Sequence, residues 1–90
     1  MVLDPRHRLT IEFCVPCNYI PRAVGLTDEL LSGWAPMIKD IELLPSSKGR
    51  FEVTLDDELI FSKASLGRHA REGEVAALVR ERIGHEVRRG

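Results

Sequence analysis

The amino-acid sequence predicts a protein of the α/β class, an α+β sandwich that combines two helices with a mixed four-stranded sheet. Two observations at the start of the chain support this. An alternating apolar run over residues 9–13 predicts a strand, and apolar residues at helical spacing over residues 18–34 predict a helix. Three more strands and a second helix follow. At 90 residues the chain has room for one domain, residues 1–90.

The first strand and the first helix lie on either side of Cys14. The strand ends directly at Cys14, and its apolar side chains share one face: Leu9, Ile11 and Phe13. The helix extends from Asn18 to Trp34, and one apolar stripe is predicted to face the core: Ile20, Ala23, Val24, Leu30, Leu31 and Trp34. Gly33 is a stop signal near its end, and Pro36 prevents continuation.

A strand, a hairpin and a second helix complete the order strand–helix–strand–strand–strand–helix. The strand over residues 38–44 directs Ile41 and Leu43 inward. Residues 51–55 and 59–62 form a hairpin around Asp56 and Asp57, because aspartate tolerates the positive φ of a two-residue turn. The last helix begins near Glu72, and its predicted buried stripe is Val75, Leu78, Val79 and Ile83. A strand–helix–strand unit predicts a parallel pair and the hairpin an antiparallel one, so the sheet is mixed.

Composition and charge restrict the partners. The net charge of −1 lacks the basic excess of nucleic-acid-binding proteins, so we expect no nucleic-acid partner. No apolar run approaches the ~20 residues of a membrane span, and the first eight residues lack the apolar core of a signal peptide. We therefore expect no membrane partner and a cytoplasmic location.

The candidate catalytic residues are Cys14 and Cys17, separated by Val15 and Pro16 at the predicted junction of strand and helix. Amide donors at a helix N-terminus stabilise a thiolate and lower its pKa below the free value of about 8.5. One sulfur can then attack a substrate disulfide, and the other can resolve the mixed disulfide. Because Pro16 has no amide hydrogen and neither intervening residue is charged, we expect a moderately lowered pKa and a reducing character. The motif predicts a thiol–disulfide oxidoreductase acting on protein or low-molecular-weight thiols and disulfides.

Two other functions stay open on the residues alone. The cysteine pair could be a redox switch in a protein-interaction module. A dimer could also bind zinc between two such motifs, since a single chain offers only His7, His69 and His85 as further ligands, none at ligand spacing. We expect these histidines at the surface. No motif indicates a bound cofactor or a resident metal.

The sequence resembles the selenoprotein W-related (Rdx) family, and the resemblance covers nearly the whole chain. The segments that carry it are residues 11–19, 21–23, 49–53, 58–62 and 67–68. It implies a thioredoxin-like fold and a thiol redox role. Some animal members of the family are linked to glutathione; those links do not carry over to this chain directly, so glutathione stays a candidate redox partner only. Members with selenocysteine carry it at the position of Cys17. Because cysteine replaces selenium here, we follow the thioredoxin pattern and expect Cys14 to be the nucleophile and Cys17 the resolving residue.

One feature of thioredoxins is missing from the expected place. Thioredoxins have a cis-proline beside the active cysteines, just before a later strand. Here Gly49 and Arg50 precede Phe51, and Pro45 comes too early to take that position. We therefore expect the substrate backbone to be held less firmly than in thioredoxins. A role for Arg68 near the sulfurs is not supported, and we expect its side chain to be solvated.

Overall fold

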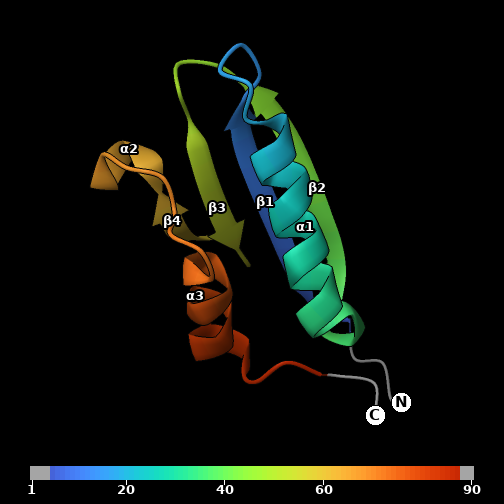
Figure 1. Cartoon of the computed structure of the whole chain (residues 1–90). Helices are drawn as coiled ribbons and strands as arrows, with labels where there is room; N and C mark the ends of the chain where they lie inside the picture. Colours follow the sequence, from blue (N-terminus) through green and yellow to red (C-terminus); the bar gives the residue numbers. More distant parts are fainter. Residues whose placement is uncertain (1–4, 88–90) are drawn as a thin grey trace.

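The computed structural model describes residues 5–87, in which helices lie against one β-sheet (Figure 1). The elements are β1 (His7–Cys14), α1 (Ile20–Trp34), the 3₁₀ turn η1 (Ala35–Met37), β2 (Ile38–Ser46), β3 (Phe51–Leu55), β4 (Glu58–Ser62), α2 (Lys63–Leu66) and α3 (Glu74–Ile83). The predicted order is confirmed, with η1 and α2 as additions. No helix within these residues has the length and apolar character needed to cross a membrane.

The sheet has the order β2-β1-β3-β4 and is mixed, as predicted. β1 pairs in parallel with β2 and antiparallel with β3, and β3 pairs antiparallel with β4. The turn between β3 and β4 places Asp56 at φ 50° and Asp57 at φ 70°, which confirms the two-residue turn. β1 is thus a central strand. The residues that follow it leave the sheet between the last residue of β2 and the first residue of β3.

The core lies on one face of the sheet and is shared by α1 and α3. Alternate residues of β1 and β3 are buried there, and Leu9, Ile11 and Phe13 pair with Leu55, Val53 and Phe51. Helix α1 contacts β1 and β2, α3 contacts β4, and the two helices contact each other (Figure 1). Both helices therefore cover the same face, a point that the sequence left undecided.

The predicted buried stripe of α1 is partly wrong. The helix buries Ala23, Leu26, Leu30 and Trp34. Ile20, Val24 and Leu31 are exposed by 47%, 54% and 42%. Val24 and Leu31 each follow a buried residue by one position, which is about 100° around the helix. The predicted stripe therefore mixed two neighbouring faces and omitted Leu26.

Burial in β2 and α3 also differs from the prediction. Ile41 is half-buried, but Leu43 is 39% exposed, because β2 is an edge strand with a neighbour on one side only. Helix α3 begins at Glu74, two residues later than predicted, with Gly73 at φ 77° before it. In α3, Val75 and Val79 are buried, whereas Leu78 and Ile83 are half-buried against the core.

Candidate functional site

The cysteine motif lies in a turn between β1 and α1, and it does not open the helix as predicted. β1 ends at Cys14, residues 15–18 form the turn, and α1 begins at Ile20. The amide of Asn18, at φ 64°, donates to the carbonyl of Val15 (3.0 Å), and the amide of Tyr19 donates to the carbonyl of Cys14 (3.3 Å). Cys17 thus precedes the helix by three residues, so the helix N-terminus supports its thiolate less than the sequence suggested.

Backbone hydrogen bonds fix the motif to both neighbours of β1. The Cys14 amide donates to the carbonyl of Arg50 just before β3 (2.8 Å), and the Val15 amide donates to the carbonyl of Ser46 at the end of β2 (2.9 Å). The turn is therefore held at the end of the sheet where strands β1 and β2 finish and strand β3 starts (Figure 1). This anchoring fixes the position of Cys14 and leaves the remainder of the turn outside the sheet.

The two sulfurs are brought together but differ in exposure. Cys14 and Cys17 form a disulfide across a Cα–Cα distance of 5.3 Å. Cys14 is 0% exposed, whereas Cys17 is exposed, as are Val15 and Pro16. A partner can therefore reach the motif at Cys17, with Cys14 behind it in the core.

An aromatic cluster that the sequence analysis missed lies beside the motif. The Tyr19 ring meets the His69 ring edge to face at 4.6 Å between centroids, and Phe51 lies 6.5 Å from Tyr19 and 6.1 Å from His69. The Lys63 ammonium lies 5.9 Å from the centroid of the Tyr19 ring, within cation–π range. These residues come from four separate segments, so no local pattern announced the cluster.

The histidines are not all surface residues, contrary to the prediction. His69 is half-buried, and its Nδ1 is buried without a hydrogen-bond partner among residues 5–87. Burial lowers the pKa of His69, and the positive charges of Arg22 and Lys63 lower it further. His7 is also half-buried and bonds through Nδ1 to Asp56 (2.6 Å). Only His85 is exposed as expected.

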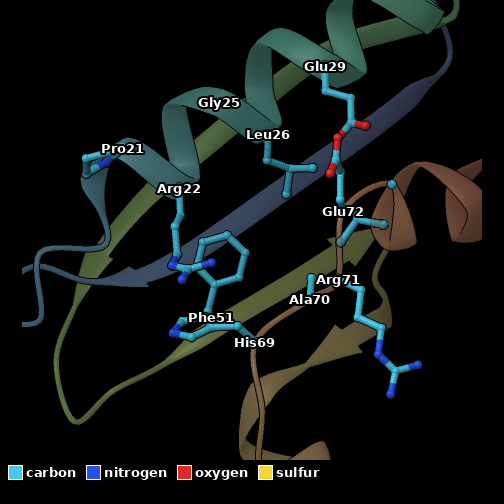
Figure 2. Close-up of a pocket in the computed structure, with 12 residues that line it drawn as sticks. Pro21, Arg22, Gly25, Leu26, Glu29, Phe51, His69, Ala70, Arg71 and Glu72 are labelled. Carbon is cyan, nitrogen blue, oxygen red and sulfur yellow. The ribbon is translucent and has the colours of Figure 1, made fainter.

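A pocket of about 530 Å³ lies between α1 and residues 69–73, and Figure 2 shows its lining. Phe51 lies at one end, beside Arg22 and His69. Glu29 of α1 and Glu72 of the opposite wall point toward one another at the other end. The sequence analysis missed this pocket. A glycine inside α1, Gly25, was the available signal, since it lines the pocket where a helix former is expected.

The Arg68 side chain is 35% exposed and so partly solvated as predicted, but it is also paired with Glu74. It donates to both carboxylate oxygens of Glu74 (2.8 and 2.9 Å) and to the carbonyl of His69 (2.9 Å). The Arg71 amide also donates to Glu74 (2.9 Å). The guanidinium of Arg68 and the Arg71 amide lower the pKa of Glu74 to about 2. This clamp closes the loop that carries His69 and one wall of the pocket.

Comparisons with known proteins agree with this geometry. The structure is similar to a selenoprotein W-related protein from Vibrio cholerae, with a TM-score of 0.79 and 26% identity over 84% of this chain and 95% of that one. It also shares its fold with a protein from Bordetella parapertussis, with a TM-score of 0.80 and 22% identity over 86% and 98% of the two chains. No curated protein matches the sequence.

The sequence model of the Rdx family matches residues 8–81 of this chain. This range includes the whole cysteine motif, the aromatic cluster and most of α3. The mixed sheet covered by helices on one face is the thioredoxin-like fold of these relatives. The chain therefore belongs to the selenoprotein W-related Rdx family.

Proposed function

We propose that this chain is a thiol–disulfide exchange protein in which Cys17 attacks and Cys14 resolves. The observation that carries this proposal is the difference in exposure of the two cysteines: Cys14 is 0% exposed and Cys17 is exposed. Burial disfavours the thiolate form of a cysteine, so the buried Cys14 is the poorer nucleophile. The assignment reverses the roles expected from the thioredoxin pattern.

The exchange proceeds in two displacements. The Cys17 thiolate attacks one sulfur of a substrate disulfide, the substrate S–S bond breaks, and one substrate thiolate leaves. The Cys14 thiolate then attacks Cys17, the mixed disulfide breaks, and the second substrate thiolate leaves. The products are the Cys14–Cys17 disulfide and two substrate thiols, so two electrons pass from protein to substrate. The 5.3 Å between the two Cα atoms already suits that intramolecular bond.

A redox-switched interaction module is the second candidate, and one observation favours it. Exposed apolar side chains lie in the motif and in the first turns of the helix that follows it: Val15, Ile20 and Val24. An apolar surface beside a cysteine pair can bind a partner in a redox-dependent way without turnover. A zinc-bridged dimer is the third outcome that the experiment distinguishes.

The test is site-resolved alkylation of the reduced protein between about pH 5 and 9, read by peptide mass. We expect Cys17 to react about tenfold faster than Cys14, because it is accessible and more readily ionised. A Cys14→Ser variant should keep the fast reaction and accumulate a mixed disulfide with substrate, whereas Cys17→Ser should do neither. Faster alkylation of Cys14 would restore the thioredoxin-like assignment.

Turnover separates the other outcomes. With dithiothreitol as reductant, an exchange catalyst reduces a small disulfide repeatedly. Negligible turnover combined with redox-dependent binding of a partner would favour the interaction module. Protection of both cysteines until a chelator is added would favour the zinc-bridged dimer.

A further inference from the structure

Strand β2 is an edge of the sheet, on the side of the molecule away from α3 (Figure 1). It has nine residues and, within residues 5–87, pairs with β1 alone. The carbonyl of Ser46 accepts a hydrogen bond from Val15, just after β1, so the backbone groups of Ser46 face β1. Successive residues of a strand direct their backbone groups to opposite sides, so Ile41 and Leu43 present theirs at the free edge. A long free edge of this kind is a template for another strand.

Helix α1 presents an apolar flank on the same side as this edge. On its other flank, Arg22 and Glu29 line the pocket and face residues 69–73, before α3 (Figure 2). Leu31 follows Arg22 by nine residues, about 180° around the helix, and Val24 follows it by two, about 200°. Leu31 and Val24 are 42% and 54% exposed. Because α1 lies over β1 and β2, the flank opposite the pocket faces the free edge of β2.

Leu43 continues this apolar flank onto the strand. It pairs in register with the buried Ile11, so its side chain lies on the face of the sheet that α1 covers, yet it is 39% exposed. Helix α1 runs antiparallel to β2, starting near the end of β2. From that end, Leu43 lies about 10 Å along β2, and residues 27–28 lie about 10–12 Å along α1. Leu43 is therefore level with the middle of α1, between Val24 and Leu31. We call these three residues the β2 flank.

The β2 flank is complementary to itself across a two-fold axis. With the axis perpendicular to the sheet at Leu43, β2 pairs antiparallel with β2 of a second copy, and the two Leu43 side chains are opposite each other on the same face. The axis then passes α1 at residues 27–28, which are equally far along the chain from Val24 and Leu31. Val24 of each copy therefore lies opposite Leu31 of the other. An isologous dimer interface requires this kind of self-complementarity.

Charge selects this register over the two neighbouring ones. With the axis at Ile41, Asp40 would oppose Glu42 of the second copy, and with the axis at Glu42, the two Glu42 side chains would oppose each other. Like charges directly opposite one another in neighbouring strands are destabilising. With the axis at Leu43, Glu42 opposes Leu44, and no two charges of the same sign are opposite each other along β2.

The backbone of β2 suits the same register. The Leu43 amide of each copy can donate to the Leu43 carbonyl of the other, and the Ile41 amide of each copy can donate to the Pro45 carbonyl of the other. Pro45 has no amide hydrogen, but this register requires only its carbonyl at the axis-facing side of the pair. A proline at this edge position therefore leaves the central hydrogen bonds intact.

We propose that this chain forms a homodimer through the β2 flank, in which two sheets join into one and the two α1 helices pack side by side. The proposal is independent of the exchange function. Ser46, which holds the motif through Val15, is three residues and about 10 Å from the axis, so the two motifs lie at opposite ends of the paired strands and stay accessible. This dimer differs from a zinc-bridged dimer, in which the two motifs meet.

Sedimentation velocity of the full chain between about 1 and 300 µM, oxidised and reduced, measures the association. We expect a dimer in both redox states with a Kd on the order of 10 µM, since the apolar surface is small for a dimer interface. Hydrogen exchange read by NMR locates the contact. The amides of Ile41 and Leu43 should exchange at least tenfold more slowly at the high concentration, whereas those of Glu42 and Leu44, which face β1, should be slow at both.

A pair of charge variants tests the two-fold contact of the helices. Val24→Lys and Leu31→Glu should each weaken the dimer at least tenfold, because each buries a charge against an apolar side chain. The double variant should recover most of the affinity, because each lysine then lies opposite a glutamate of the other copy. Leu59→Lys is the matched control: Leu59 is 53% exposed on β4, the other edge strand, and its replacement should leave the dimer unchanged. Circular dichroism confirms that each variant is folded.

Several outcomes would overturn the proposal. A protein that is monomeric at every concentration would do so, as would a double variant that associates no better than the single variants. Dissociation by Leu59→Lys would place the contact at β4, and dissociation by a chelator would favour the zinc-bridged dimer. None of these outcomes depends on the reactivity of Cys17, so the exchange function stands or falls separately on the alkylation of that residue.

Discussion

Gly25 and Gly33 are two glycines of the same helix whose surroundings differ. A Cβ at Gly25 meets nothing within 4 Å, whereas a Cβ at Gly33 would lie 2.9 Å from Cγ of Glu86. Glu86 is itself held by two hydrogen bonds from Arg80 (3.0 and 2.7 Å), so it cannot move away freely. The close approach of Glu86 thus explains why residue 33 is glycine, whereas no contact explains why residue 25 is glycine.

We therefore expect Gly25→Ala to raise the free energy of unfolding by about 0.5–1 kcal/mol, because alanine has the higher helix propensity and nothing obstructs it. Urea unfolding followed by far-ultraviolet circular dichroism measures the change. Gly33→Ala is the matched comparison and should gain less or lose stability, because its Cβ displaces Glu86. A loss of stability at Gly25→Ala would show that this glycine serves the fold.

Helix α1 and strand β2 show which features of an element the sequence could predict. The existence, type and order of the main elements followed from apolar periodicity and turn residues. The buried face of α1 did not, because apolar residues occupy an arc wider than the contact with the sheet: Leu26 is buried and Val24 is exposed. Leu43 was expected in the core, but its exposure depends on β2 being at the sheet edge, which local sequence does not encode.

The candidate site also has parts that the sequence could predict and parts that it could not. Cys14 and Cys17 were found because their chemistry and spacing are local in sequence. The pocket combines α1, the start of β3 and the loop before α3, and such long-range assembly leaves no local pattern. The motif was expected to open α1, but the turn after Cys14 places Asn18 at φ 64° and delays the helix until Ile20.

The loop before α3 depends on the Arg68–Glu74 clamp, which makes a pH-dependent contribution to stability. The pKa of Glu74 is lowered from 4.5 to about 2, first by Arg68 and then by the Arg71 amide. Because the pKa is lower in the folded state, the contribution is fully present above pH 4.5 and is lost as the pH falls from 4.5 through about 2. Glu74→Gln should therefore be less stable than the wild type at pH 7, and the difference should shrink toward zero near pH 2.

Thermal unfolding of both proteins across this pH range measures that difference. The lowered pKa of His69 also reduces stability as the pH falls, but it acts in both proteins and cancels in the comparison. Glu81→Gln is the control, because Glu81 is exposed and its ion pair with Arg82 is long, with 3.8 Å between Oε2 and Nη1. A Glu74→Gln difference that stays constant down to pH 2 would show that the clamp contributes no charge-dependent stability.

At the scale of the whole molecule, one core joins both helices to the sheet at the end remote from the motif. Trp34, the last residue of α1, is buried and donates from Nε1 to the carbonyl of Gly84 (2.8 Å). The amide of Val87 donates to the carbonyl of Gly33 (2.7 Å). Helix α1 has 15 residues and spans about 22 Å, so Trp34 is far from the cysteine turn. The only tryptophan therefore reports on the core and not on the local redox state.

Reduction of the disulfide should lower the stability of this fold without unfolding it. Cys14 and Cys17 are three positions apart, so the bond closes a very short loop, and the chain-entropy model assigns it about 2 kcal/mol. The core does not depend on that bond, because Cys14 is already fixed by its amide hydrogen bond to Arg50. Urea unfolding of oxidised and reduced protein should therefore differ by about 2 kcal/mol or less, with Trp34 fluorescence and circular dichroism coincident in both states. Unfolding on reduction would make the bond a structural staple, and a pair that must open in every cycle could not then serve exchange.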